Sequence, residues 1–258
     1  VEIIQYLYDI FGGEIDFYKQ NKNGDNALML ASSKQNTEVI KLFHVMFKGA
    51  DNINTVFMHA AKNHNTTILK SLYSTFKDVI DIDNVCLLST QNSAFNITKF
   101  LYTTFKNEIK INKINKDGYT ALMFAAKHTN IRFVSYLYKM FKDTIDINVQ
   151  NNNHETALIL AAKHTNVEFI SYLCNVFKDK IDIKIQAFMF AALNDDDDVI
   201  RYLFQICKHT IDINAKTKTG YTALMFAAQN TNVKIIQYLC AVFQATIDIG
   251  IQNIDGDT

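Results

Sequence analysis

Apolar and polar positions along the chain follow one pattern that returns every 29 to 36 residues. It is clearest between residues 131 and 141, IRFVSYLYKMF, where apolar side chains recur at helical spacing. Four positions form this stripe: Phe133, Val134, Leu137 and Phe141. The pattern predicts an amphipathic helix that buries one face.

Two shorter segments flank this helix. TALMFAAKH at 120–128 precedes it, and its paired alanines leave room for a neighbouring helix to approach closely. FKDTIDIN at 141–148 follows it and alternates with the period of an extended strand, which places Ile145 and Ile147 inward and Asp146 outward. One unit is therefore predicted to be helix, turn, helix and a short extended segment.

The unit is repeated along the whole chain. GYTALMFAA stands at 118–126 and again, letter for letter, at 220–228. A small residue marks the first helix of each unit, at Ala31, Ala60, Ser89, Ala125, Ala161, Ala191 and Ala227. A second marker follows about sixteen residues later with the same steps, at Phe47, Phe76, Phe105, Phe141, Phe177, Cys207 and Phe243. Such units bury their apolar faces only by stacking on their neighbours.

Polar residues mark where helices begin and turns close. Asn or Asp precedes six of the seven second helices and would accept hydrogen bonds from first-turn amides, at Asn36, Asn65, Asn130, Asn166, Asp196 and Asn232. Ala94 is the exception. Turn tips carry Gly24, Gly118, Gly220 and Gly256, whereas His154 takes this position in one unit. We expect that turn to be strained or differently shaped.

These motifs resemble the ankyrin repeat. The resemblance rests on DGYTALMFAA at 117–126, TALILAA at 156–162, TALMFAA at 222–228, and the IDIN closings at 145–148 and 211–214. It implies an all-α solenoid of stacked helix–turn–helix units with short β-hairpin fingers. It spans residues 1–258 as a single array of about seven to eight units.

The chain departs from the family at defined positions. The family's Pro is replaced by Ala121, Ala157 and Ala223, its His by Met123, Ile159 and Met225, and its inter-helix Gly by Thr129, Thr165 and Thr231. The full units are 36 residues long, where the family has about 33. These changes put the family's local hydrogen bonds in doubt and leave the predicted fold intact.

Three units lack the residues of the projecting finger. In INTVFMHAA at 53–61, IDIDNVCLLST at 80–90 and IDIKIQAFMFAA at 181–192, the first helix follows the Ile-rich segment almost directly. Either these fingers are deleted, or their residues were disordered and are absent from this sequence. Both ends fall inside a unit, so we expect a segment of a longer array.

The resemblance implies that hairpin tips and first helices form a concave face that binds another protein. Carried onto this chain, the candidate contact residues are Asp25, Asp117, Tyr119, Glu155, Thr219 and Tyr221. Tyr119 and Tyr221 are the leading candidates, because an exposed aromatic side chain offers contact area at low entropic cost. The alternative is that both tyrosines only cover their own hairpins.

Composition and charge narrow the function further. The 258 residues include 26 basic and 26 acidic side chains, which argues against a nucleic-acid surface or a polybasic membrane anchor. No apolar run reaches the roughly 18 residues of a membrane span, and no nucleotide, hydrolase or metalloprotease motif occurs. The histidines recur without Cys or carboxylate partners at metal-ligand spacing. Cys86, Cys174, Cys207 and Cys240 are predicted to be buried free thiols in a reducing compartment.

We therefore predict a cytoplasmic, non-enzymatic protein-interaction scaffold with no cofactor, metal or small-molecule substrate. Its partner is another protein, and a cytoskeletal protein is one candidate. Two alternatives stay open. The array could be a structural component of a cytoskeletal or axonemal assembly, or it could target an enzyme whose catalytic domain lies outside this segment.

Overall fold

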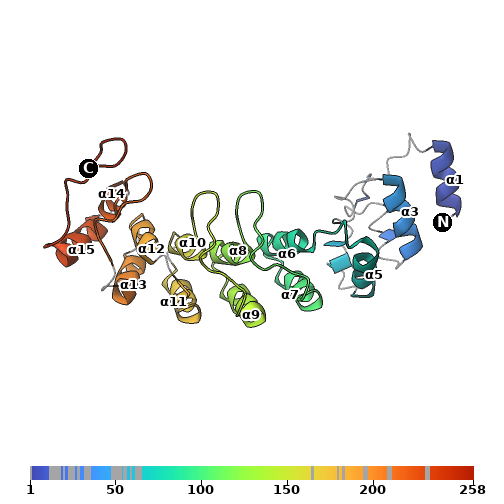
Figure 1. The fold of residues 1–258 in the computed structure, drawn as a ribbon, viewed down its shortest axis with the longest axis horizontal. Helices are drawn as coiled ribbons and strands as arrows, with labels where there is room; N and C mark the ends of the chain where they lie inside the picture. The colour runs from blue at the N-terminus through green and yellow to red at the C-terminus, as the bar shows by residue number, and fades with distance from the viewer. Residues whose placement is uncertain are drawn as a thin grey trace. The chain divides into compact units, whose positions relative to one another are not determined.

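A computed structural model describes most of the chain. The described residues are 2–11, 19, 21–22, 27, 30–31, 36–47, 54, 57–58, 60–61, 66–163, 166–178, 180–181, 184–193, 197–207, 211–229 and 233–258. Every regular element within them is an α-helix, which confirms the predicted all-α class (Figure 1). The predicted positions Gly24, Asp25, Asn65, Asp196 and Asn232 lie outside the described residues.

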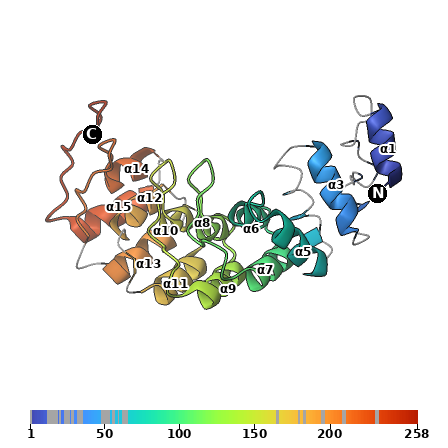
Figure 2. The ribbon, with the colours of Figure 1, turned by 45° about the vertical axis from the view of Figure 1, so that its right-hand side comes forward.

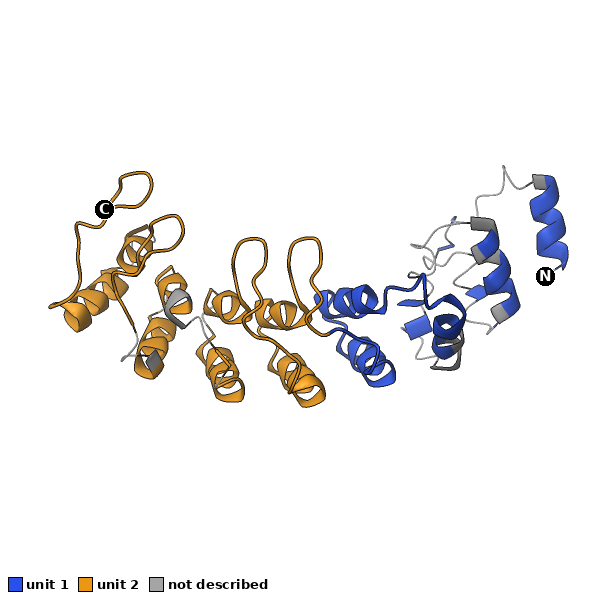
Figure 3. Cartoon of the chain, in the orientation of Figure 1, with its two compact units in different colours: residues 1–110 blue, residues 111–258 orange. Residues whose placement is uncertain are grey.

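The helices divide between two compact units, residues 1–110 and 111–258 (Figure 3). That residues 1–258 form a single array stays a prediction from the sequence. The first unit contains α1 (Glu2–Phe11), α3 (Thr37–Phe47), α5 (Thr66–Phe76), α6 (Ile82–Gln91) and α7 (Phe95–Thr104). Within it α3 contacts α5, and α6 pairs with α7 around buried residues that include Val85, Cys86, Leu101 and Tyr102.

The second unit stacks its helices in two layers (Figures 1 and 2). The first helices of successive repeats are α8 (Ala121–Lys127), α10 (Ala157–Ala162), α12 (Lys184–Ala191) and α14 (Ala223–Gln229). Each contacts the next in this order. The second helices are α9 (Ile131–Phe141), α11 (Val167–Val176), α13 (Asp198–Cys207) and α15 (Val233–Phe243), and α9, α11 and α13 also pack in sequence. This is the stacking of a solenoid.

The predicted apolar stripe of α9 forms the core. Phe133, Val134, Leu137 and Phe141 are all buried. In the closing segment Ile145 and Ile147 are buried and Asp146 is exposed, as the alternation predicts. Because each buried face lies against the next repeat, the stripe is a packing feature and not a ligand site.

The fingers are hairpin-shaped turns. In the finger at 113–120 the amide of Asn115 donates to the carbonyl of Tyr119 at 3.0 Å, and the amide of Gly118 donates to the carbonyl of Asn115 at 3.0 Å. The Asn115 side chain closes the turn from inside, because its Oδ1 accepts from the amides of Asp117 and Tyr119. Asn151 and Asn253 do the same in two other fingers. Among the described residues these turns contain no regular strand.

The turn tips require a left-handed backbone. Gly118, Gly220 and Gly256 have φ values of 82°, 81° and 86°. His154 adopts the same turn with φ 61°, in a region that costs a residue with a Cβ roughly 1–2 kcal/mol. The strain expected at His154 is therefore present. Thr129, at the family's inter-helix glycine position, also has a positive φ of 48°.

Side-chain caps begin the helices. The predicted caps Asn36, Asn130 and Asn166 accept from the amides of Val39, Phe133 and Phe169, at 3.2, 3.1 and 2.9 Å. Ala94 provides no side-chain cap for α7.

The first helices use a different cap, which the sequence analysis missed. The hydroxyl of Thr120 accepts from the amide of Met123, and the amide of Thr120 donates to Sδ of Met123 at 3.4 Å. Thr222 and Met225 repeat this exchange. The methionine that replaces the family's His thus still closes the helix start.

The prediction for the cysteines is partly wrong. Cys86 and Cys174 are buried, but Cys240 on α15 is exposed. These three cysteines form no disulfide, and the side chain of Cys207 lies outside the described part of the chain. In the short unit at 80–90, α6 begins at Ile82, two residues after the buried Ile80, with no finger between α5 and α6.

Candidate partner-binding surface

The finger surface of the second unit consists of four fingers and four first helices. The fingers are residues 113–120, 149–156, 215–222 and 251–258, and the helices are α8, α10, α12 and α14. Figure 1 shows the fingers projecting on the first-helix side of this unit. Five of the six predicted contact residues belong to it, and Asp25 lies outside the described residues.

Asparagine side chains fix the spacing of the repeats beneath the fingers. Asn112 donates from Nδ2 to the carbonyl of Thr144 at 2.7 Å and accepts at Oδ1 from the amide of Asp146 at 2.9 Å. Asn214 repeats both bonds with Thr246 and Asp248 at the same distances. The last residue of an Ile-x-Ile-Asn closing therefore ties one repeat to the backbone of the next.

Neighbouring fingers are joined in pairs. The amide of Asn152 donates to the carbonyl of Asp117 at 3.1 Å, and its Nδ2 donates to the carbonyl of Lys116 at 2.9 Å. The amide of Ile254 donates to the carbonyl of Thr219 at 3.3 Å, and Lys216 Nζ donates to the carbonyl of Gln252 at 3.1 Å. These bonds hold finger 113–120 on 149–156 and finger 215–222 on 251–258.

The two candidate tyrosines stack on the first helix of their own repeat. The ring of Tyr119 lies 5.1 Å from that of Phe124 at 24°, and the ring of Tyr221 lies 5.3 Å from that of Phe226 at 14°. Both tyrosines are half-buried, so one side of each ring covers its own repeat while part of the side chain reaches solvent. Lys127 Nζ lies 5.6 Å from the centroid of Tyr119. Burial and the charge of Glu155 raise the pKa of Tyr119, which keeps its hydroxyl protonated.

Glu155 takes the tyrosine position in the second finger but is buried, at 6% exposure. Its carboxylate accepts from Nδ2 of Asn151 at 2.7 Å and forms an ion pair with Lys163. Burial alone would raise the pKa of Glu155, but the hydrogen bonds from Asn151 and Lys163 outweigh it and the pKa is lowered. Lys163 in turn lies over the ring of Phe190, with Nζ 4.7 Å from the centroid. Glu155 therefore positions Lys163.

Asp117 and Thr219 are exposed at matching places in two fingers. Asp117 neighbours Tyr119 in the first finger, and Thr219 neighbours Tyr221 in the third. The hydroxyl of Thr219 lies 2.9 Å from that of Thr217, whose Oγ1 also accepts from the amide of Tyr221. The structure thus brings the predicted residues into two groups, Asp117 with Tyr119 and Glu155, and Thr219 with Tyr221.

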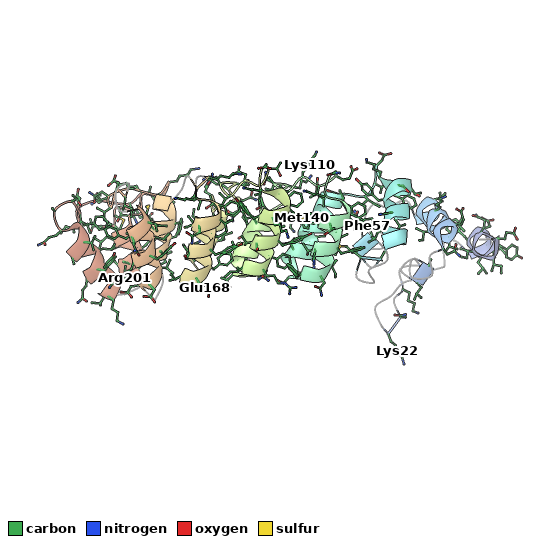
Figure 4. All side chains as sticks on the ribbon, turned by 90° about the horizontal axis from the view of Figure 1, so that it is seen from below. Lys22, Phe57, Lys110, Met140, Glu168 and Arg201 are labelled. Atoms are coloured by element: carbon green, nitrogen blue, oxygen red, sulfur yellow. The ribbon has the colours of Figure 1, made fainter. Side chains whose placement is uncertain are left out.

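The other side of the second unit is formed by the second helices. In Figure 4 Met140, Glu168 and Arg201 label α9, α11 and α13 on this side. Arg201 pairs with Asp197 at 2.6 Å and lies over the ring of Tyr238, 4.2 Å from its centroid. These contacts join neighbouring turns and repeats of the second helices. Residues on these helices therefore lie away from the fingers and can serve as controls in a binding test.

Metal clusters and membrane-spanning helices are two further features that the described residues could contain. No group of three or more His, Cys, Asp or Glu side chains there could hold a metal ion. None of the helices in this part of the chain is long and apolar enough to cross a membrane.

Comparisons with known proteins agree on the architecture. A family model described as ankyrin repeats (3 copies) matches residues 1–85, 86–187 and 177–253. The crystal structure of the ankyrin repeat domain of Bcl-3, described as a unique member of the IkappaB protein family, is similar with a TM-score of 0.57 and 19% identity, covering 78% of this chain and 90% of that one.

A second similar structure is a chain from the complex of the predatory endopeptidase Bd0816 of Bdellovibrio bacteriovorus with the immunity protein Bd3460. Its TM-score is 0.51 at 24% identity, covering 66% of this chain and 85% of that one. A comparison with curated protein sequences gives no match. At these identities the two structures show a shared fold alone.

Proposed function

Because the chain belongs to the ankyrin repeat family, whose domains are protein-interaction modules, we propose that it is a non-enzymatic scaffold that binds a partner protein through the finger surface. The observation that carries this proposal is the pair of stacked tyrosines. Tyr119 and Tyr221 are held on Phe124 and Phe226 in the same way in two repeats, with part of each ring exposed.

The stacking prepares these side chains for binding. A tyrosine already packed on a phenylalanine loses little rotamer freedom when a partner covers its remaining face. Tyrosines that are fixed and partly apolar are enriched among the residues that dominate binding energy. Both roles, covering the finger and contacting a partner, are therefore compatible in one side chain.

The other candidates surround the tyrosines. Asp117 and Thr219 would contact the partner at the exposed rim, where polar groups contribute more to orientation than to affinity. Glu155 would act through Lys163, whose ammonium it holds above Phe190. Asp25, which lies outside the described residues, stays a predicted contact residue. We place the protein in the cytoplasm, which fractionation of the source cells would test.

The test is binding of affinity-isolated partners to the full chain and to the double variant Tyr119→Ala/Tyr221→Ala. Loss of two such anchors is expected to weaken binding by at least about 30-fold, since one hot-spot residue contributes about 2 kcal/mol or more. Tyr172→Ala on α11 is the matched control, because this half-buried tyrosine lies on a second helix.

Equal binding by the double variant and the control would contradict the proposal. If the unaltered chain and the double variant both co-sediment tightly with cytoskeletal filaments, the structural alternative replaces the proposal. Circular dichroism of both variants shows whether the helices are retained.

A further inference from the structure

The row of fingers in the second unit is interrupted once, at α12. The Ala-Ala pair at 191–192 follows the pair at 161–162 after 30 residues, whereas the full units repeat after 36. The six residues lost are those of the finger. Figure 1 shows loops preceding α8, α10 and α14, while α12 lies between α10 and α14 and its chain begins the helix at Lys184.

Side chains from the two bordering fingers meet across this interruption. Lys218 Nζ lies 3.1 Å from Nε2 and 3.4 Å from Nδ1 of His154, although the two residues are 64 positions apart. Elsewhere neighbouring fingers join through backbone groups, as Asn152 does with Asp117. Here the contact joins two exposed side chains.

An aromatic surface lies on the first helices next to this point. Phe190 of α12 is half-buried and stacks on Phe226 of α14, with centroids 5.4 Å apart at 27°. Lys163 Nζ lies 4.7 Å from the Phe190 centroid. In a full repeat, the finger residue Tyr221 covers the equivalent ring of Phe226. Phe190 has no finger of its own to supply such a cover.

The charge around the interruption is positive although the chain is neutral. The bordering fingers, 149–156 and 215–222, together with Lys163 at the end of α10 carry three lysines and one carboxylate. The lysines are Lys163, Lys216 and Lys218. The carboxylate is Glu155, which is buried and already paired with Lys163. By contrast, finger 251–258 carries Asp255 and Asp257 and no lysine. The finger that follows the interruption thus carries two exposed lysines, Lys216 and Lys218, and no carboxylate.

We propose that the interrupted finger row is the docking place for an acidic segment of the partner protein. Its carboxylates pair with Lys218 and His154, and an apolar side chain covers Phe190. The positive charge of the bordering finger favours an acidic occupant, because opposite charges at a binding rim speed association and fix the register of the bound segment. The inference rests on the proposed function and adds the chemistry of the partner to it.

The probe is a displayed library of random peptides of about 12 residues, selected on the full chain. We expect enrichment of acidic sequences that contain an aromatic or aliphatic residue. Lys218→Glu should weaken binding of the selected peptides at least about tenfold, which corresponds to about 1.4 kcal/mol. Lys139→Glu, an equally exposed lysine on α9, is the matched control and should leave binding unchanged.

A second variant tests whether peptide binding requires the absence of the finger before α12. Insertion of the six residues Gln-Asn-Asn-Asn-Gly-Glu between Ile185 and Gln186 restores the length of a full unit, with glycine at the turn tip, and should abolish peptide binding. Circular dichroism and thermal melting show whether this variant folds; if it does not, Lys218→Glu decides alone, because the side chain is exposed.

Selection of uncharged or basic peptides, absence of enrichment, or equal binding by Lys218→Glu would overturn the inference. So would equal competition by single-stranded DNA, which would show a general attraction for anions. Tyr119→Ala separates the two proposals. If partner binding depends on Tyr119 but not on Lys218, the proposed function stands and this inference fails; if it depends on neither, the proposed function fails as well.

Discussion

One residue type, glycine, occupies the same left-handed turn in three fingers of the second unit for two different reasons. Gly118 and Gly256 have nearly equal φ values, 82° and 86°. A Cβ at Gly118 would lie 2.6 Å from the amide nitrogen of Asn152, in the next finger, whereas nothing lies within 4 Å of a Cβ at Gly256. Gly118 therefore serves both the turn and the contact between fingers.

This comparison makes a prediction. Gly256→Ala should cost about 1 kcal/mol, the cost of a left-handed backbone for alanine. Gly118→Ala should cost about 1–3 kcal/mol more, because the backbone of the next finger must shift. Urea unfolding followed by circular dichroism measures the difference. Equal effects of the two substitutions would show that the finger contact contributes nothing.

Glu155 provides a second contrast at this scale. It replaces an aromatic residue at the finger base, and a buried carboxylate is tolerated only with partners. Asn151 and Lys163 supply them and lower the pKa of Glu155 below its ordinary value of 4.5. The folded chain thus stabilises the ionised carboxylate of Glu155 more than the unfolded chain does. The stability it contributes is present above pH 4.5 and is lost as pH falls through the lowered pKa.

We accordingly expect Glu155→Gln to lower the free energy of unfolding by about 1–3 kcal/mol at pH 7. The difference from the unaltered chain should shrink when the pH drops below the ordinary glutamate range. Thermal melts between pH 7 and pH 3 measure both effects. Glu168→Gln, an exposed position on α11, is the control, with an expected change within about 0.5 kcal/mol at pH 7. A difference that is independent of pH would contradict the role of the ionised carboxylate.

At the scale of single helices, the caps decide where the elements begin. Asn130 and Ala94 occupy the same position before α9 and α7, with φ/ψ of −94°/88° and −81°/67°. Asn130 accepts from the amide of Phe133, whereas Ala94 has no side chain that could do so. The backbone at Ala94 is thus already close to the conformation of a capping asparagine.

Ala94→Asn is therefore expected to stabilise the chain by about 0.5–1 kcal/mol, and Asn130→Ala to destabilise it by about 1 kcal/mol. The reciprocal pair is its own control, because the two substitutions exchange the same chemistry at matched positions. Amide exchange in the first turns of α7 and α9 should slow in one variant and accelerate in the other. A gain at Asn130→Ala, or no change at Ala94→Asn, would contradict the capping argument.

The sequence predicts these second-helix caps because Asn has one strong local role at a helix start. It does not predict the Thr120 and Thr222 caps, since the family's Pro that normally follows the Thr is absent and Met Sδ is an unusual acceptor. The finger turns were expected as β-hairpins. In the first finger the amide of Asn115 donates to the carbonyl of Tyr119, and the Asn115 side chain accepts from the amide of Tyr119. These bonds span too few residues for regular strand pairing. Local sequence signals thus predict where the elements lie, whereas the hydrogen bonds within them are visible only in the structure.

On the scale of the whole molecule, the repeat period determines the order of stacking, and deviations from it determine where the surface changes. The identical stretches at 118–126 and 220–228 predict packing well, because each solves the same problem of a buried face. They predict the candidate site less well. That Lys218 meets His154 follows from a contact between the fingers of different repeats, which no single unit encodes.

Stacking also predicts how the loss of stability caused by a core substitution spreads through the second unit. Leu137 and Leu203 are both fully buried, on α9 and α13. Replacement of either by Ala should cost about 2–5 kcal/mol as a cavity. Because each repeat contacts only its neighbours, Leu137→Ala should reduce amide protection in α8, α9 and α11 more than in α14. Leu203→Ala should move the loss to α11, α12 and α13. Hydrogen exchange with mass spectrometry resolves the two patterns, and a uniform loss along the unit in both variants would show a single cooperative core instead of a chain of interfaces.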